Sequence, residues 1–281
     1  MIEYSKVLLV SDYDRTMTAF DGSIPAANLA AVEEFMARGG AFTIATGRSR
    51  PMFLGPMEGL RVNAPVILAN GGALWDPESD QITVLHPLEA EDLAVAREIT
   101  KQYPQLRLEL QGLRGHRCFG VDPLRDQYMA RYRMEPDYGG WEGLTDTYLA
   151  ACLYAPFRSD HHVRAGESNE AEERPFAEIE TLVKTRYGHR LTAVRSMPRM
   201  IEILAKDCGK GSTARELARR MGRTVLLCAG DAPNDLTMLE EADEAFIPAT
   251  ADPAILGLGF TEVASCDDGA IASIVELLKT R

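Results

Sequence analysis

Residues 7–16 read VLLVSDYDRT, and this stretch decides the fold. Val7–Val10 is a continuous apolar run of β-formers, which predicts a strand buried on both faces, as in a parallel sheet. Asp12 and Asp14 follow at once, and ligands of open parallel sheets bind at the carboxyl ends of the strands. One carboxylate can attack an electrophile while the other moves protons. An Asp-rich turn without a catalytic role is also common, so this segment alone leaves both interpretations open.

The flanking pattern extends the same architecture. Apolar spacing predicts a helix over Ala26–Arg38, and buried strands are predicted at Ala41–Ala45 and Pro65–Ala69. Strands that alternate with helices form right-handed βαβ units, which predicts an α/β fold with a Rossmann-like parallel sheet and helices on both faces.

The alternation of predicted strands and helices stops after Gly72 and resumes near Met200. The intervening segment mixes a hairpin, further strands and helices, and its stretch Arg158–Arg174 is strongly polar and predicts an exposed loop. We expect Met200–Leu204 to resume the α/β core. The predicted organisation is a discontinuous catalytic core, residues 1–83 and 196–281, around an inserted α+β cap, residues 84–195.

Composition excludes several classes of function. The 281 residues carry a formal net charge of −12, which disfavours nucleic acid and anionic membranes as partners. The five cysteines form no CxxC pair and predict buried thiols of a reducing compartment. The N-terminus resembles no signal peptide and no apolar run is long enough to span a bilayer, so we expect a cytoplasmic protein.

Three further segments follow predicted strands or open helices. In Thr43–Ser49, Thr46 and Gly47 can hold a phosphate oxygen, although a plain strand-to-helix turn explains them too. Lys210 opens a helix, where a cation opposes the dipole unless an anion neutralises it; a solvated lysine is the alternative. Gly230–Asp235 holds two carboxylates and an amide, a hard-oxygen set suited to magnesium that helix capping explains only in part.

The combination is more informative than any single segment. If these loops meet at one sheet edge, Asp12, Asp14, Asp231 and Asp235 converge. Two like charges about 4 Å apart repel by about 4 kcal/mol at an effective dielectric near 20. A divalent cation would relieve this repulsion, and Lys210 would neutralise the remaining charge.

These motifs closely resemble those of the haloacid dehalogenase-like hydrolases, in particular the Cof-type phosphatases with a type IIB cap. Asp12–Thr16 is similar to their DxDxT segment, Thr46-Gly47-Arg48 to their second motif, Lys210-Gly211 to the lysine motif and Gly230–Asp235 to GDxxND. Asn70-Gly71 resembles the Asn-Gly pair that precedes the cap.

The resemblance implies a role for each matching residue. Asp12 would be the nucleophile and Asp14 the acid and base, with Thr46 and Lys210 holding the phosphoryl oxygens. Mg²⁺ would be bound by Asp12, the Asp14 carbonyl, Asp231 and Asp235. The implied substrate-binding residues are Thr46, Gly47, Arg48, Asn70, Lys210 and Asn234.

One residue departs from the family pattern. Gly usually follows the second aspartate, and Arg15 stands there instead. We expect Arg15 to point outward from an ordinary backbone conformation, with an anion-binding position as the alternative. In the cap, the run Arg114–Arg117 includes His116, and we expect it to form an exposed loop, with contact to a sugar or other polar substrate as the alternative.

The resemblance implies a magnesium-dependent phosphatase that hydrolyses a small phosphorylated metabolite, above all a sugar phosphate. The alternatives are a phosphomutase or other phosphoryl transferase on the same scaffold, or a catalytically silent binding module. We expect a monomer or weak homodimer.

Overall fold

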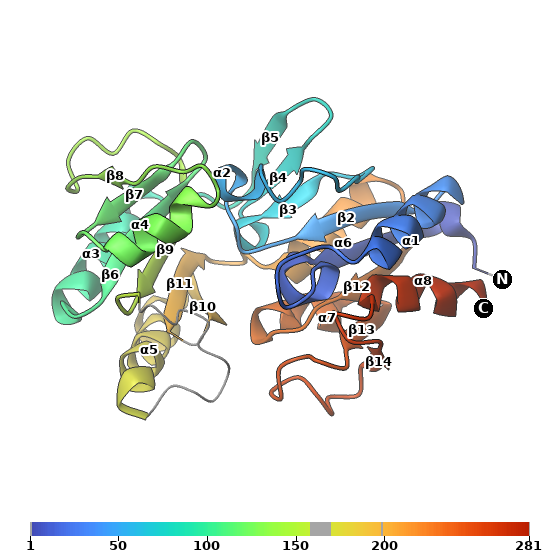
Figure 1. The fold of residues 1–281 in the computed structure, drawn as a ribbon. Helices are drawn as coiled ribbons and strands as arrows, with labels where there is room; N and C mark the ends of the chain where they lie inside the picture. Colours follow the sequence, from blue (N-terminus) through green and yellow to red (C-terminus); the bar gives the residue numbers. More distant parts are fainter. Residues whose placement is uncertain (1, 158–169, 198, 281) are drawn as a thin grey trace. The chain divides into compact units, whose positions relative to one another are not determined.

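The computed structural model describes residues 2–157, 170–197 and 199–280. The chain divides into two compact units. We call them the core unit, which comprises Met1–Gly47, Gly59–Thr83 and Gly209–Arg281, and the inserted unit, which comprises Arg48–Glu58 and Val84–Cys208. Each is described by itself below (Figure 1).

The core unit is built on an eight-stranded sheet in the order β14-β13-β12-β1-β2-β3-β4-β5. The six strands from β14 to β3 pair in parallel, and β4 pairs antiparallel with β3. All six residues of β1 are buried, as their apolar run predicts. The strands are β1 (Val7–Asp12), β2 (Ala41–Ala45), β3 (Val66–Leu68), β4 (Ala73–Asp76), β5 (Gln81–Val84), β12 (Val225–Ala229), β13 (Glu244–Pro248) and β14 (Thr261–Val263).

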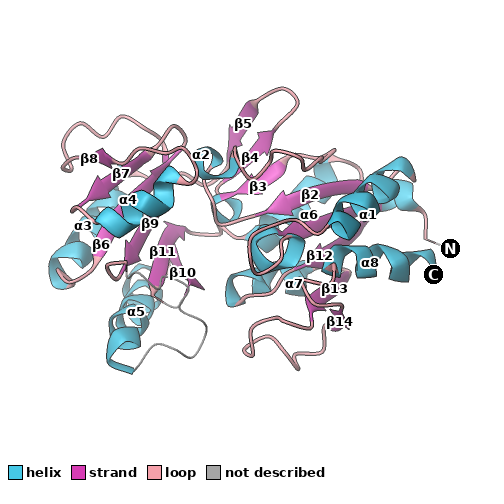
Figure 2. Ribbon diagram, viewed as in Figure 1, coloured by secondary structure: helices cyan, strands magenta, loops and turns pink. Residues whose placement is uncertain are grey.

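Four helices cover this sheet. Helix α1 packs with α8, and α6 packs with α7. Because the crossovers β1-α1-β2 and β12-α7-β13 run in opposite directions along the sheet and parallel crossovers are right-handed, these two pairs lie on opposite faces (Figure 2). The helices are α1 (Ala26–Ala37), α6 (Lys210–Arg220), α7 (Leu236–Glu241) and α8 (Ala270–Lys279).

The inserted unit contains a second, six-stranded sheet in the order β10-β11-β9-β6-β7-β8. Its apolar core joins strands β6, β9 and β11 to α3 and α5 through side chains such as Leu108, Leu153 and Phe176. The elements are α2 (Arg50–Phe53), α3 (Ala90–Gln102), β6 (Arg107–Gly112), β7 (His116–Phe119), α4 (Pro123–Ala130), β8 (Asp137–Tyr138), β9 (Tyr148–Tyr154), α5 (Glu170–Leu182), β10 (Leu191–Met197) and β11 (Met200–Ala205).

Three predictions about the inserted segment were wrong. Residues 196–208, assigned to the core from sequence, belong to the inserted unit, because β11 pairs antiparallel with β9 and β10. Residues 48–58, also assigned to the core from sequence, belong to the inserted unit as well. Most of the predicted loop Arg158–Arg174 lies outside the described residues, and its last five residues begin α5.

His116 is also not on an exposed loop. It starts β7 and is 1% exposed. Its Nδ1 lies 2.6 Å from Glu109 Oε1 and its Nε2 lies 2.6 Å from Ser49 Oγ. The order serine, histidine, acid is that of a hydrolase triad, but all three side chains are buried, so a substrate has no access to them.

The predicted fold class is confirmed: a parallel α/β sheet with helices on both faces carries an α+β insertion. All five cysteines are free and buried. Within the three described ranges, no helix combines the length and the apolar character that crossing a bilayer requires.

Candidate active site

Central strands of the core sheet end level with one another. In the parallel ladder Asp12 stands opposite Ala45, and Ser11 stands opposite Ala229. The residues that leave these three strands are therefore neighbours at the same sheet edge. They include Asp12 from β1, Thr46 after β2 and Asp231 after β12.

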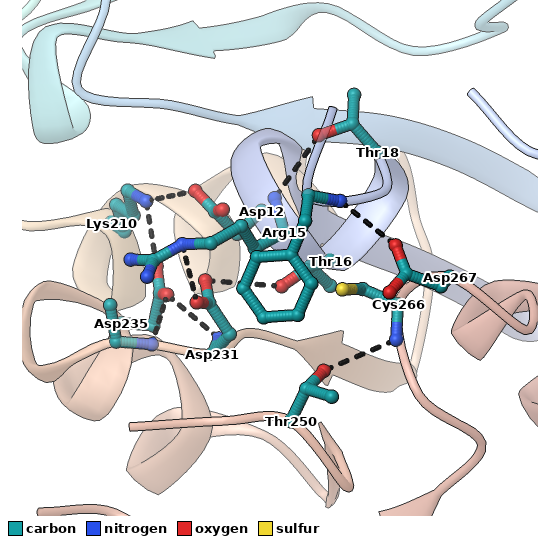
Figure 3. A network of polar contacts seen from close by, with 12 residues as sticks. Asp12, Arg15, Thr16, Thr18, Lys210, Asp231, Asp235, Thr250, Cys266 and Asp267 are labelled. Atoms are coloured by element: carbon teal, nitrogen blue, oxygen red, sulfur yellow. Dashed lines mark hydrogen bonds and ion pairs between the residues drawn. The ribbon is translucent and has the colours of Figure 1, made fainter. Parts of the chain in front are cut away.

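Lys210 joins two acids of this edge. Its Nζ lies 2.6 Å from Asp12 Oδ1 and 2.6 Å from Asp235 Oδ1 (Figure 3). The lysine and both aspartates are buried. The first residue of α6 thus supplies the neutralising charge that the sequence pattern required, and it is not a solvated lysine.

Asp235 also fixes the loop that carries Asp231. Its Oδ2 accepts hydrogen bonds from the backbone N–H groups of Asp231 and Ala232, both at 3.1 Å. A Cβ at Gly230 would lie 2.5 Å from the Cβ of Asp235, so glycine is needed for this close approach. The other end of Asp231 is also held, because Thr16 Oγ1 donates to its Oδ1 at 3.4 Å.

Arg15 does not point outward, contrary to the prediction. Its Nε lies 3.3 Å from Asp231 Oδ2. Its backbone is left-handed, with φ 58° and ψ 14°, rather than ordinary. A residue with a Cβ adopts that conformation at a cost of about 1 kcal/mol, and the ion pair is one interaction that offsets it.

The cluster holds more negative charge than its buried cation neutralises. Burial, followed by the charge of Asp235, raises the pKa of Asp12 well above its ordinary value, although Lys210 opposes this. Burial and Asp235 likewise raise the pKa of Asp231 to about 7. Burial lowers the pKa of the Lys210 amine, but Asp12 and Asp235 outweigh burial and leave it above its ordinary value.

Three of the four predicted metal-binding acids come together. Asp12, Asp231 and Asp235 each offer a carboxylate oxygen, and these atoms lie within 4.8 Å of one another. Hard carboxylate oxygens are the ligands that Mg²⁺ and Ca²⁺ prefer, so the donor set fits a divalent cation. The Asp14 side chain is exposed and not part of this group; coordination through its carbonyl stays a prediction.

A second group of predicted residues adjoins β2 and β3. Asn70 takes a left-handed conformation, with φ 52°, and its N–H donates to the Thr46 carbonyl at 3.0 Å. Asn234 Nδ2 donates to Asn70 Oδ1 at 3.4 Å. A Cβ at Gly47 would lie 3.2 Å from the Asn70 amide, so these residues form one packed cluster in the core unit.

Arg48 is assigned to the other unit of the chain. It belongs to the inserted unit, where its guanidinium lies over the Tyr132 ring, 4.6 Å from the centroid. Its predicted role in substrate binding stays a prediction. Conversely, Thr16 was assigned no role from sequence, although the Thr of DxDxT was the available signal.

Comparison with known proteins identifies the family. A family model described as haloacid dehalogenase-like hydrolase matches residues 9–275. The chain belongs to this family. The match includes both flanks of the core sheet and the insertion between them, in agreement with the resemblance carried by the motifs.

Individual haloacid dehalogenase-like relatives are distant in sequence. The Bacillus subtilis protein YxeH, named provisionally as a phosphatase, is 34% identical over 91 residues, which is 32% of this chain and 34% of that protein. The chain thus matches about a third of that relative's length.

Solved structures share the fold over nearly the whole chain. SMU.1108c from Streptococcus mutans superposes with a TM-score of 0.80 at 18% identity, covering 98% of this chain and 99% of that one. The subclass IIB sugar phosphatase BT4131 superposes with a TM-score of 0.79 at 15% identity, covering 98% and 99%.

Proposed function

We propose that this haloacid dehalogenase-like hydrolase is a magnesium-dependent phosphatase that transfers the phosphoryl group of a small metabolite to Asp12 and then to water. The observation that carries the proposal is the buried lysine shared by Asp12 and Asp235, with Asp231 beside them. A structural role alone gives no reason to bury three carboxylates around one amine.

Asp12 is the proposed nucleophile. Its carboxylate attacks phosphorus, the bond from phosphorus to the ester oxygen breaks, and an aspartyl-phosphate forms. Lys210 holds one carboxylate oxygen of Asp12 at 2.6 Å and so favours the ionised form that attack requires. Asp12, Asp231 and Asp235 would hold Mg²⁺, which supplies charge neutralisation for the phosphoryl oxygens.

Asp14 is the proposed acid and base. Its residue is exposed, unlike the buried acids, and it stands two positions after the nucleophile in the sequence. It gives a proton to the departing ester oxygen. It then takes one from the water that attacks phosphorus and releases Asp12.

Sugar phosphates are the proposed substrates. One similar fold is that of a subclass IIB sugar phosphatase, and the presence of an inserted unit supports the type IIB cap that the resemblance implies. Thr46, Gly47, Asn70 and Asn234 are the proposed phosphate-binding residues of the core unit, and Arg48 is proposed for the inserted unit.

Hydrolysis of an aryl phosphate with and without Mg²⁺ tests the proposal. Asp12→Asn removes the nucleophile with little change of shape, and we expect a loss of about 10³-fold or more in kcat. Asp21→Asn is the matched control, because Asp21 is exposed and bonded to Ser23, and it should retain wild-type turnover. Equal turnover of Asp12→Asn and wild type would refute the proposed nucleophile.

A further inference from the structure

Arg15 differs from Lys210 in how it meets the acids. The Lys210 side chain is 0% exposed and lies between two buried carboxylates. The Arg15 side chain is 45% exposed, whereas the Asp231 side chain that it contacts is 3% exposed. Lys210 is therefore a fixed part of the interior, but the guanidinium of Arg15 can leave the cluster for water without any unfolding.

The Arg15 contact uses an oxygen that a cation would need. Thr16 Oγ1 already donates to Asp231 Oδ1, and Arg15 Nε faces Oδ2 at 3.3 Å (Figure 3). A divalent ion bound to this carboxylate would share one oxygen with the guanidinium or stand beside it. Two cations in contact repel each other, so the Arg15 guanidinium and a divalent ion each weaken the binding of the other to the Asp231 carboxylate.

The loop geometry keeps Arg15 in this place. The left-handed backbone at Arg15 is stabilised by its N–H, which donates to Thr18 Oγ1 at 3.1 Å. The Arg15 side chain therefore leaves a turn of fixed geometry, three positions after Asp12. Arg15 forms an ion pair with Asp231, whereas Lys210 pairs with Asp12 and Asp235.

We propose that Arg15 is an internal counter-cation, which occupies Asp231 in the metal-free protein and competes with the divalent ion for that carboxylate. The inference rests on the proposed function in one respect, namely that Asp231 binds the ion. Arg15 accordingly lowers the affinity for Mg²⁺ while it stabilises the metal-free core.

Calorimetric titration of the metal-free protein with Mg²⁺ tests this inference. Arg15→Gln keeps an unbranched side chain at the left-handed position and removes the charge, and we expect its Kd for Mg²⁺ to fall about three- to ten-fold at low salt. Arg15→Lys keeps the charge and should stay within about two-fold of wild type. The gap between Arg15→Gln and wild type should narrow in about 0.5 M NaCl, because salt screens a half-exposed cation.

Arg38→Gln is the matched control. Arg38 is equally exposed, at 45%, pairs with Glu34 on α1, and its loss changes the net charge by the same amount. Its Kd for Mg²⁺ should equal that of wild type, which separates a local effect from the charge of the whole molecule.

A second readout uses stability rather than binding. Arg15→Gln should unfold at a lower temperature than wild type without metal and gain more from saturating Mg²⁺. An unchanged Kd and an unchanged metal-induced shift in Arg15→Gln would overturn the inference and leave the proposed function intact. If wild type itself bound no Mg²⁺, the metal-dependent mechanism would fail and the inference with it.

Discussion

Lys210 has a structural consequence besides its proposed part in catalysis. Lys210→Met keeps the length of the side chain and removes its charge, which leaves Asp12 and Asp235 buried beside each other without their cation. Removing one partner of a buried ion pair typically costs about 3–5 kcal/mol. We expect a loss of that size in the free energy of urea unfolding at pH 7 in the absence of metal.

Lys279→Met is the control for Lys210→Met. Lys279 also contacts two carboxylates, those of Glu34 and Glu276, but on the surface of α8. Its replacement should leave the free energy of unfolding unchanged, because exposed ion pairs contribute little to stability. A Lys210→Met protein as stable as wild type without metal would show that the acids relax or bind protons, and that the lysine is not needed for the fold.

Some side-chain positions in the site could be predicted from the sequence, and others could not. The meeting of Asp12, Lys210, Asp231 and Asp235 was predictable, because parallel strands bring their carboxyl ends to one edge. The inward position of Arg15 was not, because the glycine that usually stands there signals a left-handed backbone but not the direction of an arginine side chain.

At the scale of elements, the approach of α6 to α7 positions the lysine. A Cβ at Gly211 would lie 2.1 Å from the Thr237 carbonyl oxygen. Gly211→Ala should therefore destabilise the protein by about 1–3 kcal/mol, although alanine is ordinarily the better helix former. Phosphatase activity should fall as well, since α6 must move and Lys210 is its first residue.

Gly209→Ala is the control for this prediction. The nearest atom to a Cβ there is Ser212 Oγ at 3.6 Å, an ordinary contact. Thermal unfolding of the two variants side by side separates a clash from a general intolerance of the segment. A Gly211→Ala protein with the melting temperature of wild type would show that α7 can move away from the added methyl group without loss of stability.

The buried network of the inserted unit predicts a pH dependence. Glu109 on β6 accepts from Arg125 Nη2 at 2.7 Å and lies 2.6 Å from His116 Nδ1. Burial opposes ionisation, but Arg125 and His116 lower the pKa of Glu109 to about 2. A carboxyl with a depressed pKa contributes stability above its unfolded value, and this is lost as the pH falls from about 4.5 to about 2.

Glu109→Gln should therefore cost about 3 kcal/mol at pH 7, and the difference from wild type should shrink at pH 3. Urea unfolding at the two pH values measures this. Glu216 on α6 is the contrasting site: its pKa is also lowered to about 2, by Arg219 and Arg220, but on the surface. Glu216→Gln should leave the free energy of unfolding unchanged. An equal loss of stability in Glu216→Gln and Glu109→Gln would argue against burial as the cause.

Elements differed in how well the sequence specified them. Strands β1, β2 and β12 were predictable, since each is a continuous apolar run between turn residues. Residues Met200–Leu204 were expected to resume the α/β core, but they form β11 of the other sheet, because periodicity gives burial and not the partner. Strands β7 and β8 were missed, because both are short and polar; β7 pairs with β6, and β8 pairs with β7.

At the scale of the whole molecule, the two units differ in how the chain builds them. The core unit is assembled from three separate segments, whereas most of the inserted unit is the single run Val84–Cys208. The proposed metal ligands all lie in the core unit. A ligand stabilises the unit that binds it, by about 2.7 kcal/mol at one hundred times its Kd.

The two tryptophans of the chain report on the two units separately. Trp75 lies on β4 of the core unit, and Trp141 packs against Phe119 in the inserted unit. Mg²⁺ should raise the urea midpoint of Trp75 fluorescence in Trp141→Phe and leave that of Trp141 in Trp75→Phe unchanged. Adding Asp231→Asn should abolish the shift at Trp75, because a ligand is lost. Equal shifts at both tryptophans would instead show that the units unfold as one, so that metal bound in the core stabilises the insertion through the chain crossings between them.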